Sequence, residues 1–333
     1  MYKYKGKNMI NVKNKKLLSG FGMAAVLMFA SLVNAAPISV IDDRGSHVTL
    51  PDTAKRVASI SYFAADTVIA LGGKPVASTY MLKDRNPDYL LDYLSDVPEI
   101  GQRAAPNLEL LADAKPDLIV AIRRYTEANA AQLNAIAPYL ALSLETFSDS
   151  DRSIQLLGGL LGKSQQAAKL NADFHQDLDH FVKESEAKER VKYLFIWGGG
   201  EAPWAFYNEN MTAAIITALG GENVAGSNPT PHIPDNTAFE MSLESILVAN
   251  PDVIFVYDYG PDRPFESNPI WSQLNAVKKN RVYFVKDHWV ESHGPIARQM
   301  VLRESAHLLY PEEFPEFNLK DEVERFLSAG LKG

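Results

Sequence analysis

Short apolar runs rich in β-branched and aromatic residues recur along the chain, and longer stretches with helical spacing separate them. Proline, which lacks a ladder donor, is tolerated at the start of a strand, and Pro-Asp stands before or at the start of two of these runs. The pattern predicts strands at 57–61, 117–121, 191–197, 253–256 and 282–285, and a hairpin at 38–41 and 47–50. This alternation indicates an α/β protein with parallel sheets covered by helices on both faces.

Two segments of the first half return in the second half, in the same order. The octapeptide ALGGKPVA at 70–77 returns as ALGGENVA at 218–225. Leu-Glu, followed by Pro-Asp and two aliphatic residues, occurs at 108–119 and again at 243–254. Glycine just after a helix accepts the left-handed conformation that ends it. The repeat therefore predicts one α/β unit used twice, and not a short-period solenoid.

Residues 150–188 contain no proline and keep apolar residues at helical spacing. We expect one long helix here, with irregularity near Gly158-Gly159 and Gly162. A helix of about 30 residues spans roughly 45 Å, enough to join two lobes. The predicted fold is two Rossmann-like α/β lobes joined by this helix, with a ligand cleft between them and only modest opening and closing. The predicted boundaries are 36–149 for the first lobe, 150–188 for the bridging helix and 189–333 for the second lobe.

The N-terminus has the pattern of a signal peptide. Residues 1–16 carry six lysines and no acid, 17–32 are apolar, and Val33-Asn34-Ala35 is a small-x-small cleavage signal. We expect cleavage after Ala35; the alternative is an uncleaved anchor, although about 16 apolar residues are short for a membrane span.

Charge and cysteine content narrow the class of protein further. Removing 1–35 changes 33 basic against 41 acidic residues to 27 against 41, a net charge of −14. An acidic surface argues against nucleic acid or an anionic membrane as partner. The sequence holds no cysteine, which excludes disulfides and a lipid-modified cysteine. An exported protein without a lipid anchor suggests the periplasm of a Gram-negative cell.

Arginine and aromatic residues gather in the segments that follow the predicted strands, where α/β proteins bind ligands. An arginine fork suits carboxylate, hydroxamate or catecholate oxygens, and aromatic walls suit a bulky ligand. The candidate ligand-binding residues are Tyr62, Tyr80, Arg103, Arg123, Arg124, Tyr125, Trp204, Tyr259, Arg263, Trp289 and His293.

Motifs for metal ligation and catalysis are missing from the sequence. The seven histidines are scattered without metal-ligand spacing, so a bound metal would be held by the ligand's own donor atoms. Neither a nucleophile elbow, nor a phosphate loop, nor a dinucleotide-binding glycine motif occurs. An exported hydrolase is the alternative from a different class, with Ser59, Ser61 or Ser292 beside His293 as its nucleophile. We predict a binding protein without a cofactor.

The run GQRAAPNLELLADAKPDLIV at 101–120 resembles the signature segment of periplasmic siderophore- and cobalamin-binding proteins of ABC importers. The ferrichrome-type hydroxamate binders and the ferric-citrate binders are the most similar. The likeness continues to NPIWSQLNAVKKNRVYFVKDHW at 268–289. It implies the class III periplasmic binding protein fold and a monomer that hands a ferric siderophore to an inner-membrane permease and ATPase. A cobalamin or haem binder of the same fold is the alternative within the family.

The resemblance also implies residue roles. Arg103 matches the family's arginine that contacts siderophore oxygens, and Tyr125 and Trp289 match cleft aromatics. Two cleft aromatics of the hydroxamate binders fall on Asn236 and Glu291. Together with the added Arg123 and Arg124, these departures favour a more anionic ligand, such as a carboxylate or catecholate siderophore.

Glu109 and Glu244, equivalent in the internal repeat, match the family's acidic residues that meet arginines on the permease. Asn107 and Ser242 are natural helix N-caps, and an acid two residues later also favours the helix dipole. The docking and helix-stabilising roles of the two glutamates can coexist.

Overall fold

The structure, a computed structural model, describes residues 37–233 and 237–330. The predicted signal peptide at 1–35 and the position Asn236 lie outside these residues. Within the described ranges, no helix has both the length and the apolar composition needed to cross a membrane.

The first half of the described chain builds one sheet with the strand order β6-β5-β4-β3-β7-β8. All of its pairs are parallel except β5–β6, and the predicted hairpin is present as the antiparallel pair β1–β2. The strands are β1 (Ile38–Ile41), β2 (His47–Leu50), β3 (Val57–Ile60), β4 (Ala77–Tyr80), β5 (Glu99–Gln102), β6 (Ala105–Pro106), β7 (Leu118–Ile122) and β8 (Tyr139–Leu142).

Helices cover both faces of this sheet, because successive strand residues point to opposite sides. Leu118, Val120 and Ile122 of β7 belong to the same core as α1 and α5. Ile119 and Ala121 belong to a second core with α2 and α4. The helices of this half are α1 (Tyr62–Ala70), α2 (Leu108–Asp113), α3 (Arg123–Thr126), α4 (Ala130–Ile136) and α5 (Phe147–Leu160), with a 3₁₀ segment at Asp88–Leu94.

The second half builds a sheet with the order β12-β10-β9-β13-β14, and β11 also pairs with β9. β9 is parallel to β13 and β11, whereas β10 is antiparallel to β9 and β12. The expectation of wholly parallel sheets is therefore wrong. Short connections such as the one between β9 and β10 permit only an antiparallel return. The strands are β9 (Val191–Trp197), β10 (Trp204–Phe206), β11 (Gly221–Asn223), β12 (Ala238–Glu240), β13 (Val253–Tyr257) and β14 (Val282–Val285).

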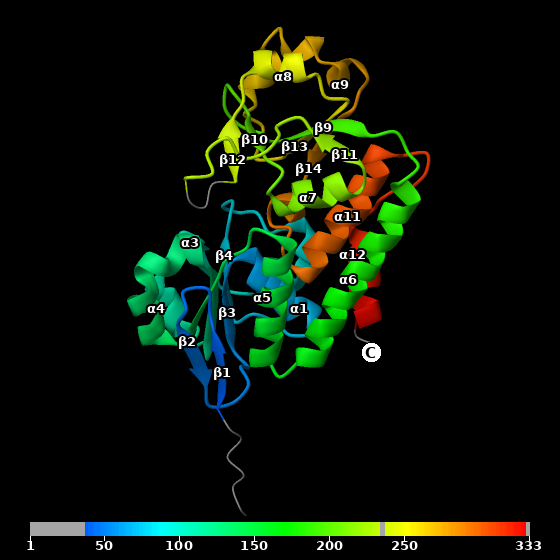
Figure 1. Ribbon diagram of the computed structural model, residues 1–333. Helices are drawn as coiled ribbons and strands as arrows, with labels where there is room; N and C mark the ends of the chain where they lie inside the picture. The colour runs from blue at the N-terminus through cyan, green and yellow to red at the C-terminus, as the bar shows by residue number, and fades with distance from the viewer. Residues whose placement is uncertain (1–36, 234–236, 331–333) are drawn as a thin grey trace, which may run out of the picture. The chain divides into compact units, whose positions relative to one another are not determined.

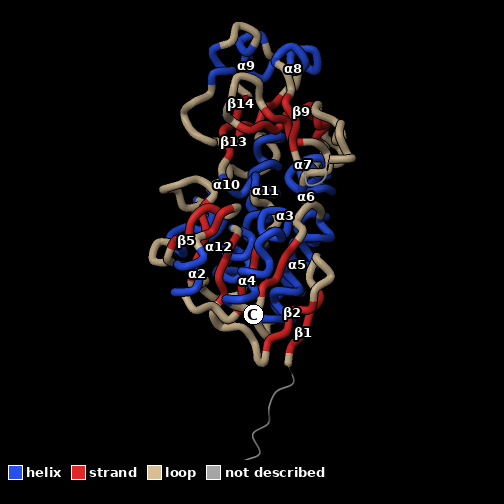
Figure 2. The backbone as a smooth tube through the Cα atoms, turned by 90° about the vertical axis from the view of Figure 1, so that its left-hand side faces the viewer, coloured by secondary structure: helices blue, strands red, loops and turns tan. Residues whose placement is uncertain are grey.

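This second sheet also has helices on both faces. α8 and α9 lie on one side, and α7 and α11 on the other (Figures 1 and 2). Leu194 and Ile196 of β9 belong to the core with α8 and α9, and Tyr193 and Phe195 to the core with α7 and α11. The remaining helices are α6 (Ser164–Ser185), α7 (Met211–Ala218), α8 (Leu243–Ala249), α9 (Asn275–Lys278), α10 (Asp287–Val290), α11 (Pro295–Leu309) and α12 (Leu319–Gly330).

The backbone repeats where the sequence does. α2 and α8 are followed by Lys115 and Asn250, which have φ angles of 46° and 49°. α1 and α7 are followed by Gly72 and Gly220, with φ angles of 74° and 96°. Equivalent helices thus end in the same left-handed conformation. The predicted fold of two α/β lobes from one duplicated unit is confirmed.

The connection between the lobes differs from the single helix expected over 150–188. It consists of α5, which starts at Phe147 and packs against the first sheet, and α6, which leads to β9 (Figure 1). Gly162 separates them with a φ of 69°, a conformation that ends a helix. The three lobe and bridge boundaries otherwise stay predictions.

The two lobes share part of their interior. A single hydrophobic cluster takes members from both halves of the chain, among them Tyr62, Ile69, Tyr89 and Leu94 from the first and Phe195, Trp289, Ile296 and Met300 from the second. Asp66 of α1 also accepts hydrogen bonds from the backbone N–H groups of Ile296 and Ala297 at 2.8 and 2.9 Å. The first turn of α11 is thereby held by a side chain from the first lobe.

Candidate functional site

Charged and aromatic side chains converge where the parallel strands of both sheets end, the edge at which α/β proteins bind ligands. Residues from the two lobes touch there: Arg103 contacts Glu291, and Arg85 contacts Asp287. We call this group the strand-end cluster. Its members are Tyr62, Arg85, Arg103, Arg124, Tyr125, Glu145, Trp197, Tyr257, Tyr259, Asp287, Glu291 and His293.

Arg103 is presented by a tight turn between β5 and β6. Gly101 makes this turn possible, because its φ is 94° and a Cβ there would lie 3.3 Å from the Ala105 oxygen. The Arg103 guanidinium carbon lies 4.8 Å from the centre of the Tyr125 ring, and its Nη2 is 3.4 Å from the Tyr125 hydroxyl. Arg124 lies 5.0 Å from the centre of the same ring. Two cations therefore lie against one aromatic ring, an arrangement suited to anionic oxygens.

Each of these cations has an acidic partner. Arg103 donates to the Glu291 carboxylate, and Arg124 to Glu145. The Glu291 side chain is 6 % exposed and the Arg103 side chain 15 %. Burial lowers the pKa of Arg103, and the charge of Arg124 lowers it further, while the Tyr125 phenol acts in the opposite direction. The predicted arginines therefore form a charge-balanced group, not a field of unpaired positive charge.

A second ion pair joins the lobes next to the first. Arg85 donates to both oxygens of Asp287, at 2.9 and 3.2 Å, and to the backbone oxygen of Asp258 at 2.6 Å. The Tyr257 hydroxyl donates to Asp287 at 2.7 Å. Burial raises the pKa of Asp287, although the Tyr257 hydrogen bond and the charge of Arg85 both act to lower it. This network fixes the loop after β4 against the end of β14.

Aromatic rings form the part of the cluster contributed by the second sheet. The Trp197 ring packs edge-on against Tyr257 at 4.8 Å and against Tyr259 at 5.7 Å between ring centres. Tyr259 is 52 % exposed. These rings can contact a bulky ligand that Arg103 binds through oxygen atoms.

His293 lies at the edge of the cluster as a neutral imidazole. Burial lowers its pKa to about 4, and the charge of Arg124 adds to the effect. Its Nε2 is buried and has no hydrogen-bond partner among the described residues. Across the described chain, no hydrogen bond joins Ser292 to His293.

Two of the predicted aromatic contacts are internal. Trp289 is fully buried, packs against Phe195 and Phe255, and donates its indole N–H to Glu304. In this structure α10 turns the ring into the core beneath the second sheet, and the role of Trp289 as a ligand contact stays a prediction. Tyr62 borders the cluster, but its hydroxyl accepts from the Met81 N–H at 3.1 Å and donates to the Arg85 oxygen at 3.3 Å.

Four other predicted ligand residues lie outside the strand-end cluster. Arg123 is held by Ser143 and Glu127, each at 2.9 Å. Arg263 donates to the Gly260 oxygen at 2.9 Å and lies over Phe284. The remaining two are Tyr80, which is half-buried at the end of β4, and Trp204, which is 46 % exposed at the start of β10.

The predicted docking residues are at the surface of both lobes. Glu109 and Glu244 are exposed in the first turns of α2 and α8. The side chains of Asn107 and Ser242 accept backbone N–H groups of these turns, as predicted for N-caps. In the part of the chain that the structure describes, neither glutamate forms a salt bridge.

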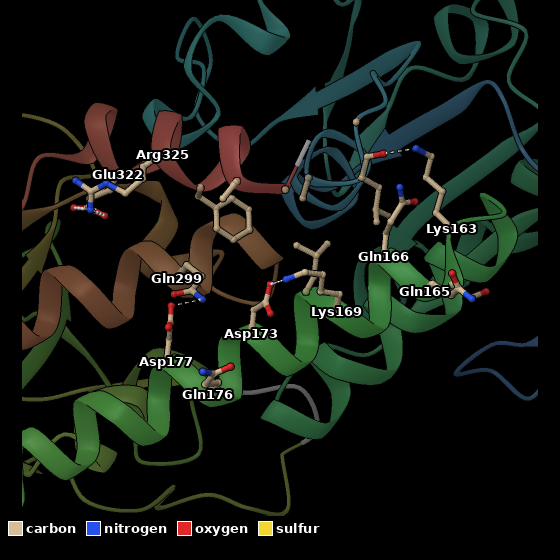
Figure 3. A pocket seen from close by; sticks show the side chains of 18 of the residues that line it. Lys163, Gln165, Gln166, Lys169, Asp173, Gln176, Asp177, Gln299, Glu322 and Arg325 are labelled. Atoms are coloured by element: carbon tan, nitrogen blue, oxygen red, sulfur yellow. Dashed lines mark hydrogen bonds and ion pairs between the residues drawn. The ribbon is translucent and has the colours of Figure 1, made fainter. Parts of the chain in front are cut away.

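A groove of about 1060 Å³ lies between α6, α11 and α12, at the end of α1 (Figure 3). None of the described residues that line it is a predicted ligand residue. Three of its cations are paired within the groove, as Lys169–Asp173, Arg303–Asp177 and Arg325–Glu322. Volume alone therefore does not identify the ligand site, and the strand ends remain the better candidate.

Arg85, Glu145 and Asp287 are among the cluster members that the candidate residues from the sequence do not include. Each follows the end of a strand, so the rule that singled out Arg103 also covers them. In the described part of the chain, no group of three or more histidine, aspartate or glutamate side chains is placed to hold a metal ion.

The family described as "Periplasmic binding protein" matches residues 57–288 of the chain. The Fe(3+)-citrate-binding protein YfmC of Bacillus subtilis is 26 % identical over 77 % of this chain and 81 % of its own. The Fe(3+) dicitrate-binding periplasmic protein FecB of Escherichia coli is 23 % identical over 87 % of this chain and 95 % of its own. Several relatives from Bacillus subtilis are named as lipoproteins.

A solved structure shares the fold. Staphylococcus aureus SirA, crystallised with staphyloferrin B, aligns with a TM-score of 0.64 and 25 % identity. The alignment covers 80 % of this chain and 98 % of SirA.

Proposed function

Because the chain belongs to the periplasmic binding protein family, we propose that it captures a ferric siderophore and delivers it to an ABC importer. One observation carries the proposal. At the strand ends, Arg103 of the first lobe packs on the Tyr125 ring and contacts Glu291 of the second lobe, which also contributes aromatic rings to the cluster. Proteins that resemble the chain are named for ferric citrate or were crystallised with staphyloferrin B, which supports an iron complex as ligand.

The proposed chemistry is recognition without catalysis. The Arg103 guanidinium donates hydrogen bonds to siderophore oxygens, and Trp197 and Tyr259 contact the organic framework. The siderophore's own donor atoms hold the iron, so the protein needs no cofactor and supplies no metal ligand.

The proposed place of action is the periplasm. Membership of the family supports a position outside the cytoplasmic membrane. Although some relatives are lipoproteins, this sequence has no cysteine to which a lipid could be attached. We therefore propose a protein that is not lipid-anchored.

Glu109 and Glu244 are the proposed contacts with the permease. Their exposure, their equivalent helix positions and their lack of salt bridges in the described chain support this role. Replacing both with glutamine should leave ligand affinity unchanged and lower binding to the reconstituted permease–ATPase complex. Unchanged complex binding would refute the docking role.

A tryptophan-fluorescence titration of the mature protein tests the proposed ligand. The panel consists of ferric hydroxamate, citrate and catecholate siderophores, with cobalamin and haem alongside. We expect saturable quenching by an iron–siderophore complex. Arg103→Ala should weaken binding about 10- to 100-fold, since a charged hydrogen-bond donor is lost.

Arg325→Ala is the matched control, because Arg325 lies in the groove of Figure 3 and not in the strand-end cluster. Its affinity should equal that of the wild type. Binding that is lost in Arg325→Ala but kept in Arg103→Ala would move the ligand to the groove. Binding of cobalamin or haem and of no siderophore would keep the transport role and overturn the ligand class.

A further inference from the structure

Glu291 already binds the Arg103 guanidinium, the group to which the proposed ligand would bind. Its carboxylate contacts Arg103 from the other lobe, while the second guanidinium nitrogen of Arg103 faces the Tyr125 hydroxyl. Glu291 is almost fully enclosed, whereas Glu145, which pairs with Arg124, is 36 % exposed. Solvent therefore screens the charge of the Glu291 carboxylate much less than it would screen the charge of a surface acid.

The charge balance at this pair affects any ligand that binds there. A ligand oxygen that contacts Arg103 must either displace the Glu291 carboxylate or share the guanidinium with it. Displacement leaves a buried carboxylate without its partner, and sharing brings two anions together. The cost of displacement is the same for any ligand, whereas repulsion between the ligand and the nearby carboxylate grows with the negative charge of the ligand.

We propose that Glu291 is a specificity-determining residue that neutralises Arg103 and biases the site toward iron complexes of low net charge. This inference rests on the proposed function. It revises the expectation, drawn from Arg123 and Arg124 in the sequence, that the site favours a more anionic ligand. The paired acids Glu127 and Glu145 complete the same balance at those two arginines.

The test compares two iron complexes that differ in net charge. Three catecholates around ferric iron give a trianion, and three hydroxamates give a neutral complex. Both are titrated against the wild type and Glu291→Gln, a variant that keeps the shape and a hydrogen-bond acceptor. The variant should bind the trianion at least about tenfold more tightly, and the neutral complex within about threefold of the wild type.

Glu324→Gln is the control for the charge change itself, because Glu324 is an exposed acid on α12. It should leave both affinities unchanged. If Glu291 served only to hold the lobes together, Glu291→Gln would change both affinities by the same factor. That outcome, or a weaker affinity for the trianion, would overturn the inference.

A double variant covers the case in which Glu291→Gln does not fold. Arg103→Gln with Glu291→Gln replaces a neutral ion pair by a neutral amide pair and buries no lone charge. The ratio of the two affinities should stay within about threefold of the wild-type ratio. A tenfold fall in the relative affinity for the trianion would show that the Arg103 charge was available to the ligand, against the inference.

The same titrations distinguish failure of the proposed function from failure of the inference about Glu291. A wild-type protein that binds no iron complex refutes both the siderophore role and this inference. A wild type that binds, with the same ratio of the two affinities in Glu291→Gln, refutes this inference alone.

Discussion

At the scale of single residues, Asp66 is an acid outside the strand-end cluster whose surroundings are tightly constrained. It is fully buried, accepts two backbone N–H groups of α11, and leaves no room for a side chain at Gly294. A Cβ at Gly294 would lie 2.2 Å from an Asp66 oxygen. Asp66 thus caps a helix of the other lobe, a role usually taken by the residue that precedes the helix.

The titration of Asp66 gives the stability of the protein a specific pH dependence. Burial raises its pKa to about 7, although both N–H groups and the charge of Arg298 act to lower it. The unfolded value is about 3.9. Between these values the folded state keeps a proton that the unfolded chain has lost, so this contribution to the free energy of unfolding falls as pH rises.

We therefore predict that Asp66→Asn removes this decline, because asparagine does not titrate. Urea unfolding at a series of pH values should show the wild type losing stability relative to the variant between about pH 4 and pH 7. At the low-pH end, the variant should be less stable by about 1–3 kcal/mol if its amide satisfies only one N–H group. Asp173→Asn, at an acid of α6 whose side chain is 46 % exposed, is the control and should show no such difference. Parallel curves for wild type and Asp66→Asn would contradict the prediction.

The sequence revealed one half of the strand-end cluster. Arg103 and Tyr125 follow predicted strands and match a recognisable segment, so both were predicted. Glu291 attracted attention only as a departure from an aromatic residue. Its partner Arg103 is 188 positions away, and the partners Arg85 and Asp287 are separated by 202. Pairing over such separations depends on how two lobes are placed, which local patterns do not encode.

At the scale of elements, the break between α5 and α6 depends on close packing. A Cβ at Gly158 would lie 2.4 Å from the Cβ of Ala167, so the two helices touch through the bare backbone of this residue. The next glycine has ordinary space: a Cβ at Gly159 would be 3.8 Å from the Ser164 hydroxyl. Two adjacent glycines of one helix therefore have different roles.

This difference predicts opposite effects of the same substitution. Gly158→Ala should lower the free energy of unfolding by about 1–3 kcal/mol, because α6 must move away from α5. Gly159→Ala should raise it by about 0.5–1 kcal/mol, because alanine restricts the unfolded chain and favours the helix. Thermal and urea unfolding of both variants provide the measurement, and each serves as the control for the other. Equal effects of the two substitutions would show that the helix contact is not tight at Gly158.

Strand positions were predicted better than their directions. β9 and β14 have the expected bounds, β3 and β13 differ by one residue at one end, and β7 differs by one residue at each end. An apolar run identifies a buried strand but does not show its direction. The antiparallel strands β10 and β12 have only three residues each and were missed. The helix break had a visible signal in Gly162, but helical periodicity continues across it. The distinction between one helix and two depended on the packing at Gly158 and on the φ of Gly162.

At the scale of the whole molecule, the two lobes are joined by more than a connecting helix. Residues of α1 and of the segment 81–97 share a core with α6, α7, α11 and α12. Arg298 of α11 is fully buried and contacts Asp151 of α5 and Asn171 of α6, each at 2.8 Å. A shared interior of this kind opposes independent movement of the lobes and couples their stabilities.

Because of this coupling, we predict that the two lobes unfold together in one transition. All four tryptophans lie between Trp197 and Trp289, so fluorescence reports on the second lobe. Ile119→Ala creates a cavity in the first lobe, in a core that contains no residue of the second. It should lower the free energy of unfolding by about 2–5 kcal/mol and shift the tryptophan transition to lower urea with an unchanged slope.

Ile254→Ala, in the second lobe, is the control and should shift the tryptophan transition whether or not the lobes are coupled. A tryptophan transition that moves in Ile254→Ala but stays in place in Ile119→Ala would mean that the lobes unfold separately despite their common core.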